Sequence, residues 1–296
     1  CGNAAADQVQ TITVEDNTAP TITPPADVIT FTNDGCTATD VVLGTPVVDD
    51  NCTATGDLMV TNDAPTAFPF GQTIVTWTVT DGCGNTATAT QNVTVGGHTL
   101  SGTFKYYGLN PNGTPKTVFD NLSGINIELW QNNAKVYPAT GTITTDPAGA
   151  YAFTDICSGT YQVVASTTKT TTGAINSTDA AQVNYWGVSP YLIQLVRFYT
   201  GDGVMDNWLD GSDASRILKN FTTSGTWGWV NRGPWTFWLT GETIDDNILS
   251  PPVLPTQIDL PSITITTTSL TKDFYGMVTG DFNGSFVPSA KSYGHS

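Results

Sequence analysis

Four closely spaced aspartates have the types and positions to converge on a hard cation. They are Asp202, Asp206, Asp210 and Asp213. Numbered from Asp202, they occupy positions 1, 5, 9 and 12 of a loop, where a chain wrapped around Ca²⁺ places oxygen ligands. The backbone carbonyl of Trp208 would add a ligand at position 7, whereas Val204 at position 3 offers no side-chain ligand. The spacing predicts a calcium site, and a solvated acidic turn is the alternative.

Two short helices are expected to frame this loop. Asn176 is a suitable N-cap for a helix that reaches Val183, and a second helix is predicted over residues 211–219. Together they resemble the calcium-binding module of dockerins, where Asp replaces the final Glu of an EF-hand loop. The resemblance implies a dockerin-like domain over residues 167–296, with strands after the helices, as in secreted Bacteroidetes-type proteins.

At the first predicted helix, the sequence has the last ligand of a calcium loop but lacks the first ligands. Asp179 lies at the helix start, but the preceding TTKTTTG has no carboxylate. Near the other end of the sequence, Gly280–Ser285 has the first ligands of a calcium loop but lacks the last ones. We therefore expect Asp281, Asn283 and Ser285 to join Asp179 in a second, composite calcium site.

The preceding part of the chain reads as short strands and turns. Residues 73–79 alternate with period two, as a half-buried strand does. The phrases DNTAP, DDNC, FPFG and TDGCGN recur at spacings that resemble the hyaline-repeat (HYR) domain. This resemblance covers residues 16–97 and implies an immunoglobulin-like sandwich common in bacterial surface proteins.

In such a sandwich, a linker and two loops lie at one end. They would crowd together Asp16, Asp49, Asp50 and Asp81. Four carboxylates repel one another unless a cation lies between them, so we expect a calcium site that stiffens an inter-domain junction. Ordinary Asp turn chemistry is the alternative. Cys52 and Cys83 would lie near each other there, although sequence alone leaves disulfide connectivity open.

A second sandwich is expected over residues 98–166. The segments 124–129, 145–153 and 159–163 resemble the characteristic phrases of Cna-B or carboxypeptidase-regulatory-like domains. That resemblance implies a stalk spacer. The predicted fold class is therefore mainly β, with tandem immunoglobulin-like or prealbumin-like sandwiches followed by a dockerin-like helix pair packed on β-strands.

The first fifteen residues predict a strand that lacks a domain of its own. The sequence of Cys1–Val14 is similar to that of Cys83–Val95, which forms the last strand of the HYR-like segment. We expect this strand to donate itself to a sheet, most simply in another copy of the chain.

Composition narrows the function. A net charge of -16 argues against partners such as nucleic acid or anionic membrane, and membrane insertion is not expected. Five cysteines and many turns suit an oxidising, extracellular setting. Neither a nucleophile arrangement nor an acid–base pair is recognisable, so we expect a protein that is not an enzyme.

Two functions remain. The first is a secreted subunit that assembles head to tail with other copies of itself into a surface filament, stiffened by Ca²⁺. The second is a cell-surface adhesin that binds surface glycans, cut from a longer multi-repeat protein. The aromatic run Trp227–Trp238 would stack on sugars if exposed, but such a run is more often core.

Overall fold

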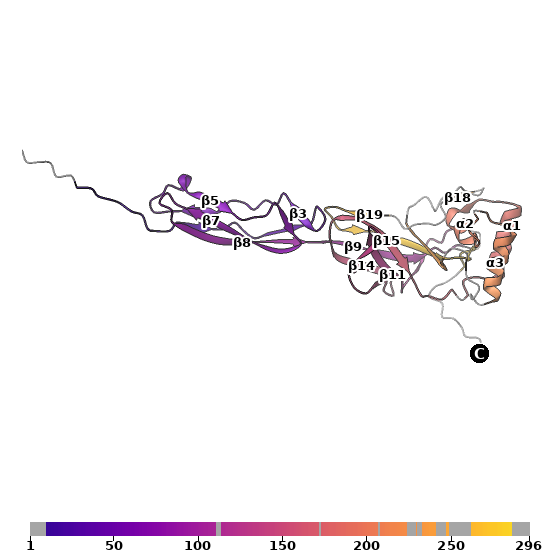
Figure 1. Ribbon diagram of the computed structural model, residues 1–296. Coiled ribbons are helices and arrows are strands. Elements are labelled where there is room, and N and C mark those ends of the chain that lie inside the picture. Colours follow the sequence, from indigo (N-terminus) through magenta and orange to yellow (C-terminus); the bar gives the residue numbers. More distant parts are fainter. Residues whose placement is uncertain are drawn as a thin grey trace, which may run out of the picture. The chain divides into compact units, whose positions relative to one another are not determined.

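The computed structural model describes residues 10–110, 114–171, 173–206, 208–223, 229, 233–240, 247–248 and 262–285. The chain divides into two compact units, Cys1–Gly97 and His98–Ser296 (Figure 1). Both are built largely from strands, so the predicted mainly β fold class is confirmed. None of the helices in the described ranges is long and apolar enough to cross a lipid bilayer.

The first unit consists of one four-stranded sheet and two strand pairs. The sheet has the order β2 (Val28–Phe31), β8 (Thr86–Gly96), β7 (Gly71–Thr80) and β5 (Met59–Asn62). The pairs are β1 (Thr21–Thr23) with β4 (Val47–Asp49), and β3 (Thr37–Thr39) with β6 (Ala67–Pro69). A 3-10 turn, η1 (Thr55–Asp57), precedes β5.

Strand β7 supplies much of the core of this unit. Val75, Trp77 and Val79 are buried while the residues between them are partly exposed, which confirms the predicted period-two strand. The indole Nε1 of Trp77 donates to the Gln91 side chain at 3.1 Å. Gln91 in turn donates to the backbone carbonyls of Ala26 and Leu43, so a buried polar group ties β8 to two loops.

The segment that leads into the first unit forms no strand in its described part. Residues 10–20 pair with none of the strands in the described part of this chain. The side chains of Ile12 and Val14 are 77% and 88% exposed. Residues 1–9 of the predicted donor strand lie outside the described residues, and its docking on another molecule stays a prediction.

Over its described residues, the second unit contains two larger sheets and one pair of short strands. In the first, β9 (His98–Tyr106) is flanked by neighbours drawn from four parts of the chain: β10 (Asp120–Asn121), β14 (Ala150–Ile156), β20 (Leu270–Thr271) and β21 (Phe274–Val278), with β17 (Trp235–Leu239) beyond β21. The second has the order β12 (Ala134–Tyr137), β11 (Asn126–Gln131), β15 (Gly159–Ser166) and β19 (Ser262–Ile265), with β13 (Ile143–Thr144) also on β11.

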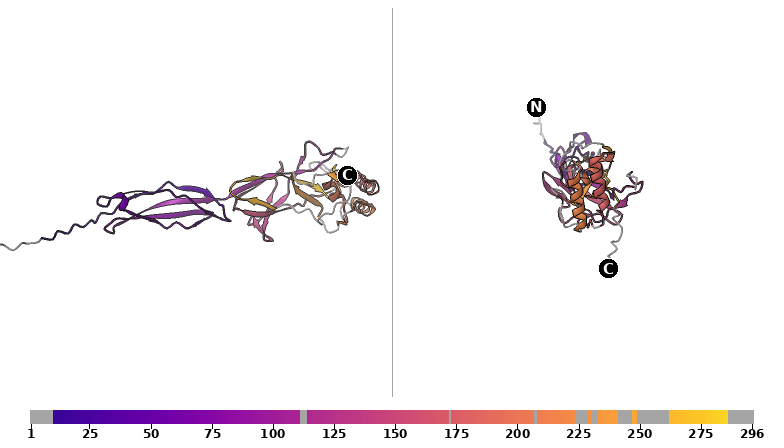
Figure 2. Two further views of the ribbon diagram at one scale, coloured as in Figure 1. Left: turned by 90° about the horizontal axis from the view of Figure 1, so that it is seen from above. Right: turned by 90° about the vertical axis from the view of Figure 1, so that its right-hand side faces the viewer.

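Three helices gather at one end of this unit (Figure 1). They are α1 (Ser177–Val188), α2 (Leu195–Gly201) and α3 (Gly211–Thr222), and a short pair of strands, β16 (Ile193–Gln194) and β18 (Asn247–Ile248), lies among them. Helices α1 and α3 pack side by side, as Figure 2 shows. Both begin with a capping box, Asn176 with Asp179 and Asp210 with Asp213, which confirms the two predicted helices.

The helices and the strands of the second unit share one hydrophobic core. Residues 98–166 and 167–285, which the sequence predicts to belong to two domains, both contribute to it. Trp238 and Phe237 of β17 are buried, and Trp229 and Trp235 pack partly buried against the same core. These residues support the core interpretation of the aromatic run, while Trp227 lies outside the described residues.

Close backbone approach on β9 gives a test of this arrangement. A Cβ at Gly102 would stand 1.8 Å from the carbonyl oxygen of Lys272, between β20 and β21. Gly102→Ala should therefore lower the free energy of unfolding by about 3 kcal/mol, because the two backbones must separate. Gly233→Ala is the matched control, since its Cβ would meet nothing closer than 3.9 Å. Thermal denaturation that is equal for the two variants would contradict the pairing.

Candidate metal centres

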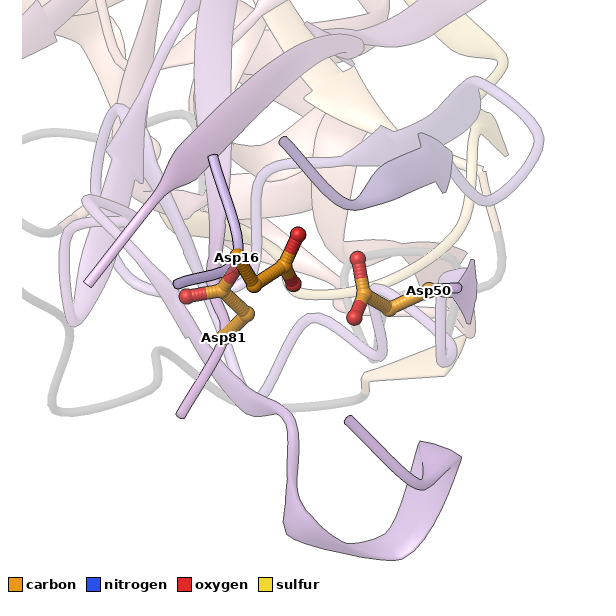
Figure 3. A group of neighbouring side chains, drawn as sticks. All are labelled: Asp16, Asp50 and Asp81. Carbon is orange, nitrogen blue, oxygen red and sulfur yellow. The ribbon is translucent and has the colours of Figure 1, made fainter. Parts of the chain in front are cut away.

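The first candidate centre consists of Asp16, Asp50 and Asp81. One carboxylate oxygen of each lies within 4.8 Å of the others, and Figure 3 shows the carboxylates of Asp16 and Asp50 facing each other. Asp16 comes from the segment that precedes β1, Asp50 follows β4, and Asp81 follows β7. Three separate segments of the first unit therefore bring negative charge to one place.

Local hydrogen bonds hold each carboxylate in position. Asp50 Oδ2 accepts the N–H groups of Cys52 and Thr53, and Asp81 Oδ1 accepts those of Cys83 and Asn85. The backbone bonds from Thr53 and Cys52 hold the pKa of the Asp50 carboxyl below its usual value. Burial raises the pKa of Asp81, but its hydrogen bonds with Asn85 and other donors outweigh this and leave it lowered. Both groups are thus ionised at neutral pH.

Two oxygens of this centre have no hydrogen-bond partner among the described residues. Asp16 Oδ2 and Asp50 Oδ1 are buried and accept no hydrogen bond. Asp16 uses its other oxygen, Oδ1, to accept from Thr18 N at 3.0 Å and from Asn51 Nδ2 at 3.4 Å. A buried anionic oxygen without a partner is costly, and a hard cation such as Ca²⁺ would satisfy both atoms.

The second candidate centre is the loop between α2 and α3. It gathers oxygens of Asp202, Asp206 and Asp213 within 4.8 Å of one another. Asp202 and Asp213 are buried, whereas Asp206 is exposed. Burial raises the pKa of Asp213 to about 7, and the charges of Asp202 and Asp206 add to that effect. The loop thus contains a carboxylate that is unstable as an anion unless a cation or a proton neutralises it.

Three backbone bonds shape this loop. Asp206 N donates to Asp202 Oδ1 at 3.2 Å. Val204 N and Asp210 N donate to the two oxygens of Asp213 at 3.2 and 3.0 Å. In the numbering that begins at Asp202, these bonds run from position 5 to 1, from 3 to 12 and from 9 to 12. Met205, at position 4, has a left-handed backbone with φ of 59°.

The composite set repeats this geometry from two distant segments. Ser285 N donates to Asp281 Oδ1 at 3.0 Å. Asn283 N and Asn176 N donate to the two oxygens of Asp179, both at 2.9 Å. With Asp281 as position 1 and Asp179 as position 12, these are the same three bonds. Gly284, again at position 4, has φ of 61°. The chain therefore builds the loop geometry twice, once from a continuous segment and once from two.

The composite set carries less negative charge than the continuous loop. Asp179 and Asp281 are its carboxylates, and both are fully buried. Burial, followed by the charge of Asp281, raises the pKa of Asp179 to about 7. Arg197 lies close by: its Nε donates to the Phe282 carbonyl at 2.8 Å, and its guanidinium stacks over the Phe282 ring. Because this cation offsets part of the charge, we expect the composite set to bind Ca²⁺ more weakly than the loop.

Tyr106 connects the composite set to the sandwich. Its hydroxyl donates to Asp281 Oδ2 and accepts from Val278 N. Burial, and then the Asp281 charge, raises the pKa of Tyr106 far above its ordinary value, so the phenol keeps its proton. No pattern in the sequence indicated Tyr106 or Arg197, because each lies far along the chain from the carboxylates it serves.

The remaining predicted ligands lie differently. Asp49 ends β4 with an exposed side chain, because strand alternation turns it away from Asp50. Asp210 is the N-cap of α3, where its side chain accepts from Ser212 N and Oγ, and these bonds lower its pKa. Trp208 is exposed, and its N–H donates to Asp206 Oδ1. Asp49 and Asp210 stay outside the two groups of three carboxylates.

Two protein-family models match parts of the chain. The HYR domain matches residues 15–95 and the SdrD B-like domain matches residues 100–185. The predicted HYR resemblance is confirmed, and the SdrD B-like match supports the Cna-B-type prediction. Both matched domains are structural or adhesion modules, and together they support a modular, extracellular surface protein. A search among curated proteins found no match.

Several solved structures share local similarity with the chain. One is BcpA, the major pilin subunit of Bacillus cereus, at 17% identity over 32% of this chain and 27% of that one, with a TM-score of 0.23. Another is a protocadherin gammaB7 EC3-6 cis-dimer, at 10% identity over 52% and 48%, with a TM-score of 0.24. A third is the glucan-utilization protein SGBP-B of Bacteroides ovatus, at 14% identity over 51% and 44%, with a TM-score of 0.19. The chain spans less than half of each, and at these scores no functional argument follows.

The composite set makes a prediction about metal stoichiometry. Asp281→Asn should remove one bound Ca²⁺ per chain, because an amide cannot replace a carboxylate beside Asp179. Isothermal titration together with metal analysis would measure the count. Asp155→Asn is the control, since Asp155 is exposed and Asn tolerates its left-handed backbone. Asn283→Ala should weaken the same site without removing a buried charge. An unchanged count and affinity in both variants would refute the composite site.

The raised carboxyl pKa values make a second prediction. Asp179 and Asp213 have pKa values of about 7, against an ordinary value of 3.8 for an aspartate, so the folded chain binds these protons more tightly than the unfolded chain. In a chelator, stability should therefore rise as the pH falls from about 7 towards 4. We expect a Tm increase of roughly 5 °C, the size produced by about 2 kcal/mol.

Calcium should replace the protons and suppress this rise. Tryptophan fluorescence reports mainly on the second unit, which contains all but one of the eight tryptophans. Falling stability over the same pH window in chelator would contradict the assignment, whatever calcium does.

Proposed function

We propose that this chain is a structural module of an extracellular surface protein, and that calcium ions stabilise the module at three sites. The repetition of one loop geometry, at residues 202–213 and at residues 281–285 with 176–179, is the observation that supports it most. Both copies have matching backbone bonds, matching capping boxes and a left-handed residue at position 4. Such a pattern is what a chain needs to surround a calcium ion.

Calcium at the composite site would close the second unit. The site joins the segment after β21 to the start of α1, and one of its hydrogen bonds spans 104 residues of sequence. Without a cation, the buried carboxylates of Asp179 and Asp281 repel each other at low dielectric. An ion that binds only the folded chain would add about 2.7 kcal/mol at a hundred times its Kd.

Calcium at the Asp16 centre would brace the entry to the first unit. Asn85 Nδ2 donates to the Asp16 carbonyl at 3.0 Å, so the segment before β1 is already tied to the loop after β7. An ion among Asp16, Asp50 and Asp81 would add the loop after β4. Residues 10–15 would then leave the unit from a fixed point.

A filament is the assembly that we propose for this module. The exposed side chains of Ile12 and Val14 alternate on a segment that pairs with no strand among the described residues. Such a segment can add to an open sheet edge of another copy and supply main-chain hydrogen bonds. A contact of this head-to-tail kind repeats without closing, and therefore gives a fibre.

The adhesin alternative is less well supported. Its predicted glycan surface was the aromatic run, and four described aromatics of that run pack in or against the core. Glycan binding by a monomeric chain would favour it over the filament.

Self-assembly can be tested on the donor segment. Replacing both Ile12 and Val14 with Asp should abolish calcium-dependent fibres in electron micrographs, because charges cannot enter a sandwich core. Val42→Asp is the matched control, since Val42 is also largely exposed, at 83%, but lies elsewhere in the first unit. Monodisperse monomers of the unaltered chain in calcium, measured by light scattering, would overturn the filament and leave the calcium-braced module standing.

A further inference from the structure

Two cysteines flank the Asp16 centre. Among the described cysteines, Cys52 and Cys83 are free, and both are exposed. Each lies two residues after one of the centre's carboxylates, Asp50 or Asp81, and its N–H donates to that carboxylate at 3.0 or 2.9 Å. The two cysteines therefore belong to the same two turns that position the metal ligands.

The two turns touch each other next to the cysteines. Gly82 N donates to Thr53 Oγ1 at 3.0 Å, which links the residue after Cys52 to the residue before Cys83. The carboxylates of Asp50 and Asp81 also lie within 4.8 Å of one another by their nearest oxygens. Each cysteine is therefore the chain neighbour of a residue in the hydrogen bond that joins the two turns.

We propose that Cys52 and Cys83 form a disulfide that locks these two turns together and raises the affinity of the Asp16, Asp50 and Asp81 centre for Ca²⁺. This inference rests on the proposed calcium site. Its physical basis is preorganisation: turns that are already joined lose less freedom when an ion binds between their carboxylates.

The bond would form by exchange with a disulfide oxidant, such as oxidised glutathione or a thiol–disulfide oxidoreductase. One cysteine thiolate attacks the disulfide bond of the oxidant. This forms a mixed disulfide with one half of the oxidant and releases the other half as a thiolate. The second cysteine thiolate then attacks the mixed disulfide and releases the bound half as a second thiolate. The two cysteines lose two electrons and two protons in total, and the oxidant is reduced to two thiols. Both side chains are exposed, so the oxidant can reach them.

A disulfide at this place is compatible with a bound cation. Three carboxylates lie near the pair, and the bond adds no negative charge to them. A disulfide has no charge, and it leaves the buried unpartnered oxygens Asp16 Oδ2 and Asp50 Oδ1 for the cation. The bond would also cross-link β4 and β7 through the turns that follow them.

The experiment maps the bond and measures calcium binding at this centre separately. Full-length protein is treated with oxidised glutathione, alkylated without reduction and cleaved with endoproteinase Asp-N, which cuts between the two cysteines. Mass spectrometry should find a peptide pair linked through Cys52 and Cys83. Hydrogen exchange over residues 50–53 and 81–85 then gives the calcium concentration that halves their exchange.

Replacing both cysteines with Ser should raise that calcium midpoint roughly fivefold or more, whereas the midpoint at residues 202–213 stays unchanged and serves as the internal control. Cys52→Ser alone should match the double variant, because one cysteine cannot form the bond. Reduction of the unaltered chain is not used, since it would break the disulfide bonding of Cys36 and Cys157 as well.

Each of the remaining outcomes shows which part of the proposal is wrong. Absence of the linked peptide after oxidation overturns the disulfide and leaves the calcium sites untouched. A linked peptide with equal midpoints in all variants overturns the coupling alone. If calcium slows exchange at residues 202–213 but never at 50–53 and 81–85, the first centre is not a calcium site, and both this inference and that part of the proposed function are wrong.

Discussion

The loops of this protein depend on hydrogen bonds in which an aspartate carboxylate accepts backbone N–H groups. At Asp50, Asp81, Asp179 and Asp213, the carboxylate fixes the turn that carries it and is held in place by the same bonds. Such bonds stabilise an anion only partly, because burial and neighbouring carboxylates oppose it. The resulting excess of buried negative charge is what makes a divalent cation the natural complement of each centre.

The second unit shows how one such centre can govern a whole fold. Strand β9 pairs with strands from before and after the helices, so the sandwich is completed by residues 262–278. The segment that follows β21 then reaches back to α1 through the hydrogen bond from Asn283 N to Asp179, and Tyr106 of β9 donates to Asp281 in the same segment. Sheet, helices and the composite centre are therefore mechanically one body, whose stability should follow the state of two carboxylates.

Local signals predicted much of this chain, and distant pairings were harder to predict. The capping residues Asn176 and Asp210 predicted α1 and α3. The alternation of apolar and polar residues over 73–79 predicted β7. The grouping of Asp16, Asp50 and Asp81 followed from a known sandwich topology. Helix α2 was missed because it has no side-chain cap and is buried along most of its length. The shared core and the Tyr106–Asp281 bond, 175 residues apart, left no local trace in the sequence.

The central claim is that calcium closes the second unit between residues 176–179 and 281–285. Anomalous diffraction from a crystal of the full chain grown in calcium tests it most directly. We expect a calcium peak bounded by Asp281, Asn283 and Asp179, in addition to one among Asp202, Asp206 and Asp213. A peak in the continuous loop alone, with Asp179 and Asp281 merely hydrogen-bonded, would contradict it.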